Sequence, residues 1–254
     1  MKLSISAKAL ALSASLLVAT TLLVQPASAQ AFSDDQRQQI EGIVKDYLMK
    51  HPELIQDVMA ALDKKQQEAD AAKATATIKD NNATLFNSPH QVVLGNPQGK
   101  VQIVEFFDYN CGFCKRALPD MMTLIKSDPD IKFVLKEFPV LGEGSVEAAH
   151  VAVAARMQDP TGKKYIDFHQ KLLGGRGPAD KARALAVAKD VGFDMARIEK
   201  DMNSDEVKTT IDEDMKLADA LGVNGTPSYV VGNELIVGAV GLDALKEKIP
   251  GGAK

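Results

Sequence analysis

The chain has 254 residues, a formal net charge of −4 and only two cysteines, and it contains no tryptophan. A mildly acidic balance without a basic block excludes most proteins that bind nucleic acids or acidic membranes. The scarcity of aromatic residues also argues against an aromatic-rich sugar site.

Residues 1–29 have the composition of a signal for export. Two lysines make the start positive, an apolar run from Ala9 to Val24 follows, and Ala27-Ser28-Ala29 matches a signal-cleavage pattern. We therefore expect a mature chain that begins at Gln30 and lies in the periplasm. A retained membrane anchor is the alternative, and no later stretch is apolar enough to span a bilayer.

The region 30–83 is expected to form an N-terminal helical hairpin or stalk. Ser33 is suited to cap a first helix, and His51-Pro52-Glu53 marks the start of a second, which Asn81-Asn82 would end. Two short helices with one apolar stripe bury little surface, so they must dock on the main domain or associate with copies of themselves. A long polar stretch after Leu62 favours self-association.

The next segment has the pattern of a β-α-β unit. Val92-Val93-Leu94 is a short strand, and Val101–Phe107 is apolar enough to be buried on both faces. A helix over Lys115–Ser127 and a strand over Ile131–Lys136 follow. The motif Cys111-Gly112-Phe113-Cys114 thus lies at the carboxyl end of a buried strand, where ligands of open α/β sheets collect.

A helical insertion of about residues 142–221 interrupts this sheet. After it come Gly225-Thr226-Pro227, two strands over Ser228–Val231 and Glu234–Val237 joined by a Gly-Asn turn, and a closing helix over Leu242–Lys248. The sequence therefore predicts an α/β domain over 84–254. Its inserted helices are expected at Glu147–Met157, Lys163–Leu173, Lys181–Val191, Asp194–Asn203 and Ser204–Leu221.

Cys111 and Cys114 are placed for reversible disulfide chemistry. A bond between them closes only a tiny loop and adds little stability, so a purely structural disulfide is the weaker reading. The helix N-terminus favours the thiolate of the first cysteine. Cys111 is therefore expected to be the nucleophile and Cys114 the resolving thiol, although the pair could instead bind copper.

The ordered set of Glu-Phe-Phe, CxxC, helical insertion and Gly-Thr-Pro resembles the DsbA-like thioredoxin-fold oxidoreductases of the bacterial periplasm. The resemblance implies a thioredoxin fold with an inserted helical domain, and a cis Pro227 that faces the disulfide. It also implies that the backbone of Thr226 pairs with an extended substrate peptide. Phe113, Tyr109 and Tyr229 either form an apolar rim for the substrate or belong to the core.

Two further residues are expected to tune the chemistry. By resemblance, Glu105 lies below the disulfide and relays a proton to or from Cys114; a structural ion pair, with Lys136 as its partner, is the alternative. Strongly oxidising family members carry Pro-His between the cysteines, and Phe113 can supply neither charge nor a hydrogen bond. We therefore expect a reduction potential between about −270 mV for thioredoxin and about −120 mV for DsbA.

The N-terminal region resembles that of the ScsC/Com1-like branch, in which the extension can mediate trimers. Together these features predict a periplasmic thiol:disulfide oxidoreductase or isomerase for unfolded or misfolded exported polypeptides. It would be a homo-oligomer served by a membrane redox partner. No soluble cofactor is expected, because the Cys111–Cys114 disulfide carries the electrons. The rivals are a copper-binding or copper-tolerance protein that uses both cysteines, and an inactive interaction protein.

Overall fold

A computed structural model describes residues 32–249, which divide into two compact units between Met59 and Ala60. The expected signal peptide, residues 1–29, and its cleavage point before Gln30 lie outside the described residues. None of the described helices combines the length and the apolar character needed to cross a membrane.

The first unit consists of α1 (Asp34–Lys50) and the beginning of α2 (Glu53–Asp80). Ser33 caps α1 as expected: its hydroxyl accepts the Gln36 N–H, and the Gln36 side chain accepts the Ser33 N–H. Pro52 separates the two helices. Since α1 buries none of its own residues, its apolar side chains are left exposed within the chain.

The second unit is built on a five-stranded sheet with the order β1-β3-β2-β4-β5. The central strands β2 and β3 are parallel, and the other neighbours are antiparallel. This topology confirms the expected β-α-β unit and the closing hairpin. The strands are β1 (Val92–Gly95), β2 (Val101–Phe107), β3 (Ile131–Glu137), β4 (Ser228–Val231) and β5 (Glu234–Val237).

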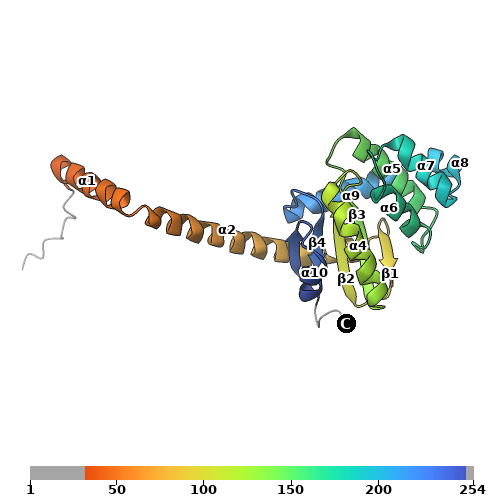
Figure 1. The fold of residues 1–254 in the computed structure, drawn as a ribbon, viewed down its shortest axis with the longest axis horizontal. Helices are drawn as coiled ribbons and strands as arrows, with labels where there is room; N and C mark the ends of the chain where they lie inside the picture. The colour runs from red at the N-terminus through yellow and green to blue at the C-terminus, as the bar shows by residue number, and fades with distance from the viewer. Residues whose placement is uncertain (1–31, 250–254) are drawn as a thin grey trace, which may run out of the picture. The chain divides into compact units, whose positions relative to one another are not determined.

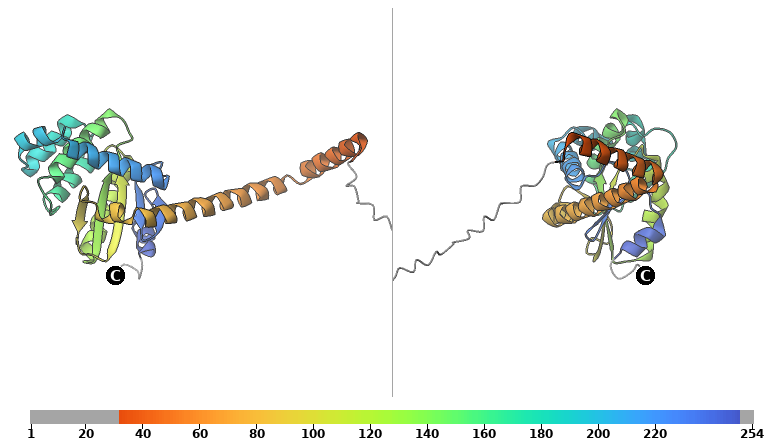
Figure 2. Two further views of the ribbon diagram at one scale, coloured as in Figure 1. Left: turned by 180° about the vertical axis from the view of Figure 1, so that it is seen from behind. Right: turned by 90° about the vertical axis from the view of Figure 1, so that its left-hand side faces the viewer.

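Alternate residues of β2 enter two separate cores. Ile103 and Phe107 pack in the core that α4 and α10 contribute to, whereas Val104 and Phe106 pack with the end of α2, α3 and α9. In Figure 1, α4 lies over the central strands, and the view from behind in Figure 2 shows α9 across the other side. The covering helices are α3 (Asn82–Asn87), α4 (Gly112–Ser127), α9 (Asp205–Leu221) and α10 (Leu242–Lys248).

The insertion between β3 and β4 is helical, as expected, and its first four helices gather at one end of the sheet (Figure 1). Asp180, Asp194 and Ser204 cap helices α7, α8 and α9 through their side chains. Gly192 and Gly222 end α7 and α9 in the left-handed conformation. The first four are α5 (Glu143–Arg156), α6 (Tyr165–Leu173), α7 (Lys181–Val191) and α8 (Met195–Asp201).

Candidate active site at the cysteine pair

Cys111 is the N-cap of α4, so its sulfur lies where helix N–H groups have no partner within the helix. The N–H of Cys111 donates to the carbonyl oxygen of Asp108 at 3.0 Å, which closes a tight turn after β2. The Cys111 thiol donates to the carbonyl oxygen of Thr226, with 3.1 Å between Sγ and O. The sulfur expected to be the nucleophile thus stands at the start of α4, in contact with the main chain of Thr226.

The Thr226–Pro227 peptide bond is cis, which confirms the expectation drawn from the resemblance. Gly238 directly follows β5, and its N–H donates to the Pro227 carbonyl oxygen at 2.8 Å. This hydrogen bond holds the cis-proline loop against the end of β5. Residues 115 positions apart in the sequence, Cys111 and Thr226, are thereby brought into contact.

Cys114 lies one turn further along α4 and is fully buried. Burial raises the pKa of the Cys114 thiol well above its usual value, and the nearby Glu105 raises it further. A hydrogen bond from the main chain of Asp108 acts in the opposite direction and favours the thiolate. Both thiols are buried, Cys111 with 5% of its surface exposed and Cys114 with none.

Glu105 is 3% exposed and lies on the α4 side of β2. Burial raises its pKa from 4.5 to about 8, and a hydrogen bond from Tyr229 partly offsets this rise. The Tyr229 hydroxyl donates to Oε1 at 3.4 Å, because Glu105 and Tyr229 are directly paired on β2 and β4. Near neutral pH this carboxyl group therefore holds a proton close to Cys114.

The expected partnership of Lys136 with Glu105 is wrong. Lys136 Nζ lies 3.1 Å from Asp214 Oδ1 and 3.5 Å from Glu213 Oε1, and it donates to the Thr84 carbonyl oxygen. Phe106, the neighbour of Glu105 in sequence, is the residue paired with Lys136, so the two charged side chains point to opposite faces of the sheet.

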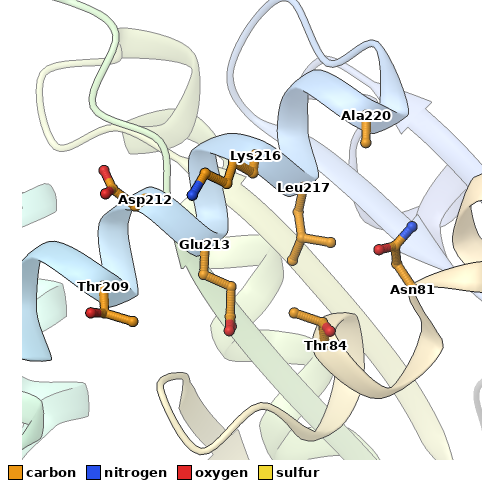
Figure 3. A pocket seen from close by; sticks show the side chains of 8 residues that line it. All are labelled: Asn81, Thr84, Thr209, Asp212, Glu213, Lys216, Leu217 and Ala220. Atoms are coloured by element: carbon orange, nitrogen blue, oxygen red, sulfur yellow. The ribbon is translucent and has the colours of Figure 1, made fainter.

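A pocket of about 560 Å³ lies beside this ion pair rather than beside the cysteines. Figure 3 shows Glu213 of α9 pointing toward Thr84 at the start of α3, and Asp212 and Lys216 on the same helix. Because Lys136 already neutralises Glu213 from below, the pocket offers no convergent group for redox chemistry.

The three aromatic residues considered for a substrate rim differ in their exposure to solvent. Phe113 is 56% exposed, and the guanidinium carbon of Arg116 lies 4.1 Å from its ring centroid. Tyr109 and Tyr229 are buried core residues. Of the three, Phe113 alone is exposed enough to meet a polypeptide.

Tyr109 belongs to a buried polar cluster that the sequence did not predict. Its hydroxyl lies 3.0 Å from the Tyr165 hydroxyl and 3.3 Å from His169 Nδ1, and Tyr165 donates to Glu137 Oε1 at 3.3 Å. Burial lowers the pKa of His169 to about 3 and raises that of Glu137 well above its usual value. Only the insertion of α6 beside the cysteine loop brings these distant residues together.

Within residues 32–249, no three His, Cys, Asp or Glu side chains converge as a metal site would require. His169 is part of the core, and His90 and His51 contact glutamates. The two cysteines are thus the chemically distinctive groups of this site.

Two family models match the chain. Residues 102–250, more than half of the sequence, match the DSBA-like thioredoxin domain, and residues 36–69 match the copper resistance protein ScsC N-terminal domain. The match to the first model spans both cysteines, the insertion and the cis-proline loop.

Solved structures and curated relatives agree with these matches. A thioredoxin-like oxidoreductase from Silicibacter pomeroyi is 45% identical over 66% of this chain and 95% of its own, with a TM-score of 0.62. Proteus mirabilis ScsC in a transitional conformation is 27% identical over 87% of this chain and 96% of its own, also with a TM-score of 0.62. Disulfide bond formation protein D of Bacillus subtilis is 25% identical over 74% of this chain and 83% of its own.

A Na⁺/H⁺ antiporter of Salinispora arenicola also matches, at 25% identity, but the chain spans only 24% of that longer protein. The shared part covers 62% of the present chain. Fold, cysteine geometry and family matches therefore agree: the chain belongs to the DSBA-like thioredoxin-domain family and is a thiol:disulfide oxidoreductase with an ScsC-type N-terminal region.

Proposed function

We propose that this oxidoreductase exchanges disulfides with unfolded or misfolded exported polypeptides in the periplasm. The observation that carries the proposal is the position of Cys111, at the N-terminus of α4 and 3.1 Å from the carbonyl oxygen that precedes the cis proline. A sulfur in this position lies next to the loop that would hold a substrate segment, and the thiolate is the form of a cysteine that attacks disulfides.

In the reduced state the Cys111 thiolate attacks a substrate disulfide. A bond forms between Cys111 and one substrate sulfur, and the other substrate sulfur leaves with the electron pair and takes up a proton. Cys114 then attacks Cys111 and releases the second sulfur, so the Cys111–Cys114 disulfide holds the oxidation equivalent. This cycle needs no soluble cofactor.

Glu105 is the proposed proton acceptor for Cys114. With a pKa of about 8, a minor fraction of Glu105 is ionised at pH 7, and this fraction can take the thiol proton. At the rim, Thr226 and Pro227 would pair with an extended substrate segment, and the exposed ring of Phe113 would contact its apolar side chains.

The N-terminal unit supports a homo-oligomer, with a trimer as the form that the ScsC resemblance implies. The exposed apolar residues of α1 and early α2 line one groove, and burying them against copies of the same unit would remove them from water. Several active sites around one space would favour isomerisation of wrongly paired substrates, with a membrane partner keeping the cysteines reduced. The groove is lined by Ile40, Glu41, Val44, Lys45, Leu48, Met49, Pro52, Ile55 and Gln56.

The test is recovery of ribonuclease activity from wrongly paired ribonuclease on addition of the reduced mature protein. We expect recovery that disappears in Cys111→Ser. If the reduced wild-type protein restores no activity, but the protein with the Cys111–Cys114 disulfide oxidises a dithiol peptide and is itself reduced, it is an oxidase; if neither form reacts, the exchange proposal is wrong.

A copper-binding role is the second candidate, since residues 36–69 match a domain named for copper resistance. Two adjacent thiolates can hold Cu(I), but Cys114 would first have to lose a proton from a buried thiol of raised pKa. Competition for Cu(I) between the reduced protein and a chromophoric chelator would test this role. Tight binding that requires both cysteines, without any disulfide exchange, would favour copper over exchange.

A further inference from the structure

Asp108 is a buried carboxylate beside the cysteines that the proposed exchange chemistry does not use. It is 1% exposed. Oδ1 accepts the N–H of Asn110 and the hydroxyl of Ser145, both at 2.7 Å, and Oδ2 accepts the N–H of Leu141 at 3.0 Å. Ser145 and Leu141 belong to the start of the helical insertion, so this side chain joins the cysteine loop to the insertion.

Asn110 adds a second connection to the same insertion. Its Nδ2 donates to Ser145 Oγ at 2.9 Å and to the Ala179 carbonyl oxygen at 2.8 Å, while its Oδ1 accepts the Ala179 N–H at 2.7 Å. Asp108 and Asn110, which both precede Cys111, are therefore held against two separate segments, near residues 141–145 and at residue 179. Such a fully satisfied buried network restricts the main chain that it holds.

The main chain of Asp108 touches both cysteines. Its carbonyl oxygen accepts the N–H of Cys111 at 3.0 Å. A hydrogen bond from the Asp108 main chain also lowers the pKa of the Cys114 thiol, against the larger opposite effect of burial. A backbone N–H aimed at a buried sulfur stabilises the thiolate form more than the thiol form. The side-chain contacts of Asp108 hold the same residue whose main chain makes these contacts, in the turn that leads into α4.

We propose that Asp108 is a positioning residue for the resolving step, because its anchored carboxylate fixes the main-chain N–H that stabilises the Cys114 thiolate. This inference rests on the proposed exchange function. In the step, the Cys114 thiolate attacks the Cys111 sulfur of the mixed disulfide. The Cys111–Cys114 bond forms, the bond to the substrate sulfur breaks, and that sulfur leaves with the electron pair and takes a proton from water.

Two variants loosen the anchor in different ways. In Asp108→Asn, one oxygen can still serve Asn110 and Ser145, but the amide nitrogen faces the donor N–H of Leu141 and cannot accept from it. Ser145→Ala removes one donor from the carboxylate and leaves its charge in place. Asp159→Asn is the matched control, since Asp159 accepts main-chain N–H groups at the start of α6 and contacts neither cysteine.

The experiment mixes each reduced protein with excess oxidised glutathione, quenches with acid and counts glutathionylated and oxidised protein by mass spectrometry. The second-order rate of mixed-disulfide formation measures the reactivity of Cys111 toward glutathione disulfide. The rate of its decay, which does not depend on glutathione concentration, measures the attack by Cys114. For Asp108→Asn we expect formation within about twofold of wild type and decay about tenfold slower, the range expected for one weakened hydrogen bond to a charged group. Ser145→Ala should change decay in the same direction by less, and Asp159→Asn should change neither rate.

If Asp108 had only a structural role, Asp108→Asn would slow formation and decay of the mixed disulfide together, or would slow neither. Its loss of thermal stability would then equal that of Asp159→Asn. Either result would overturn the inference, and if Asp108→Asn does not fold, the ratio of the two rates in Ser145→Ala decides. A wild-type protein that forms no mixed disulfide at all would instead overturn the proposed function.

Discussion

Glu105 is the side chain at which solution pH should act most directly on the chemistry. Its pKa of about 8 results from burial and is only partly offset by Tyr229. Between pH 6 and pH 8 the ionised fraction of this group rises steeply, while the Cys114 proton that it must accept remains bound. The resolving step should therefore accelerate across this range.

Replacing Glu105 with Gln should remove that acceleration and slow decay of the glutathione mixed disulfide by about 10- to 100-fold at pH 7.5. The measurement is the decay rate as a function of pH in both proteins. Glu137→Gln is the matched control, because Glu137 is also buried with a raised pKa but is bonded to Tyr165 instead of facing Cys114. A Glu105→Gln protein with the wild-type profile would exclude the proton relay.

Phe113 should set the reduction potential of the cysteine pair. Its ring faces Arg116 and offers no donor to the sulfur of Cys111, whereas a histidine could carry positive charge there. We expect Phe113→His to have a more oxidising potential than wild type in equilibrium with glutathione, and Phe113→Leu to change it little. A wild-type potential outside the interval from about −270 to about −120 mV would contradict the prediction.

The sequence was sufficient for contacts that depend on local geometry, and insufficient for those that depend on sheet faces. The placement of the cysteine pair follows from one strand and the helix after it, whereas the position of Glu105 beneath it is what the family resemblance implies. Lys136 was paired wrongly because the registers of β2 and β3 place it opposite Phe106, and thus on the other face from Glu105. Asp108 is anchored by Ser145, 37 positions later in the sequence, a contact that no local pattern indicates.

Helix α2 has an exposed first part and a last part that is buried on one side. Its side chains near the end, Ala74 and Ile78, are buried in the second unit, whereas Leu62 is exposed. The last turns of this helix therefore belong to the core of the catalytic unit. A truncation intended to remove the N-terminal region alone should end near residue 59.

We expect the mature chain without residues 30–59 to keep disulfide exchange with glutathione and to lose ribonuclease isomerisation. Removal of residues 30–83 should instead destabilise the sheet. In the full chain, Ile78→Ala should lower the free energy of unfolding by about 2–5 kcal/mol, and Leu62→Ala by less than about 0.5 kcal/mol, in urea titrations. Isomerisation that survives in the 60–254 chain would contradict the proposed role of the stalk.

Helix α1 should form an interface between copies of the chain. Val44→Asp combined with Leu48→Asp places two charges in the apolar groove, and we expect this variant to sediment as a single chain while still exchanging with glutathione. Gln38→Asp with Gln39→Asp, outside the groove, should retain the wild-type mass. A wild-type protein that sediments as a monomer would contradict the proposed oligomer.

The sequence pattern does not predict α3, because Asn81-Asn82 indicates only the end of the preceding helix. Leu85 and Phe86 of this short helix are buried with Ile78, so tertiary packing supports six residues that lack the length for independent helix formation. The inserted helices were predicted more closely, because Asp180, Asp194, Ser204, Gly192 and Gly222 give explicit start and stop signals.

The stability of the whole molecule should fall as the pH rises from 5.5 to 8. Three buried carboxyl groups have raised pKa values: Glu105 to about 8, Asp214 to about 7, and Glu137 in the same direction. A carboxyl with a raised pKa favours the folded state below its unfolded pKa, and this contribution is lost as the pH rises through the folded value. His169, with a pKa of about 3, opposes them by one proton below about pH 6.5.

Because three groups outweigh one, the folded state binds more protons than the unfolded state across this range. We expect the free energy of unfolding in urea to decrease by on the order of 2–3 kcal/mol per pH unit. An equal or greater stability at pH 8 than at pH 5.5 would show that these carboxyl groups are ionised in the folded protein.

Both cysteines of the chain stand at the active site, so neither core contains a structural disulfide. The catalyst can therefore reach its native state without the product of its own reaction. It does not depend on an earlier generation of the same enzyme, and a cell that stops supplying oxidant would still make a folded, reduced protein. Such independence suits the proposed role, in which the enzyme must be present before wrongly paired polypeptides can be corrected.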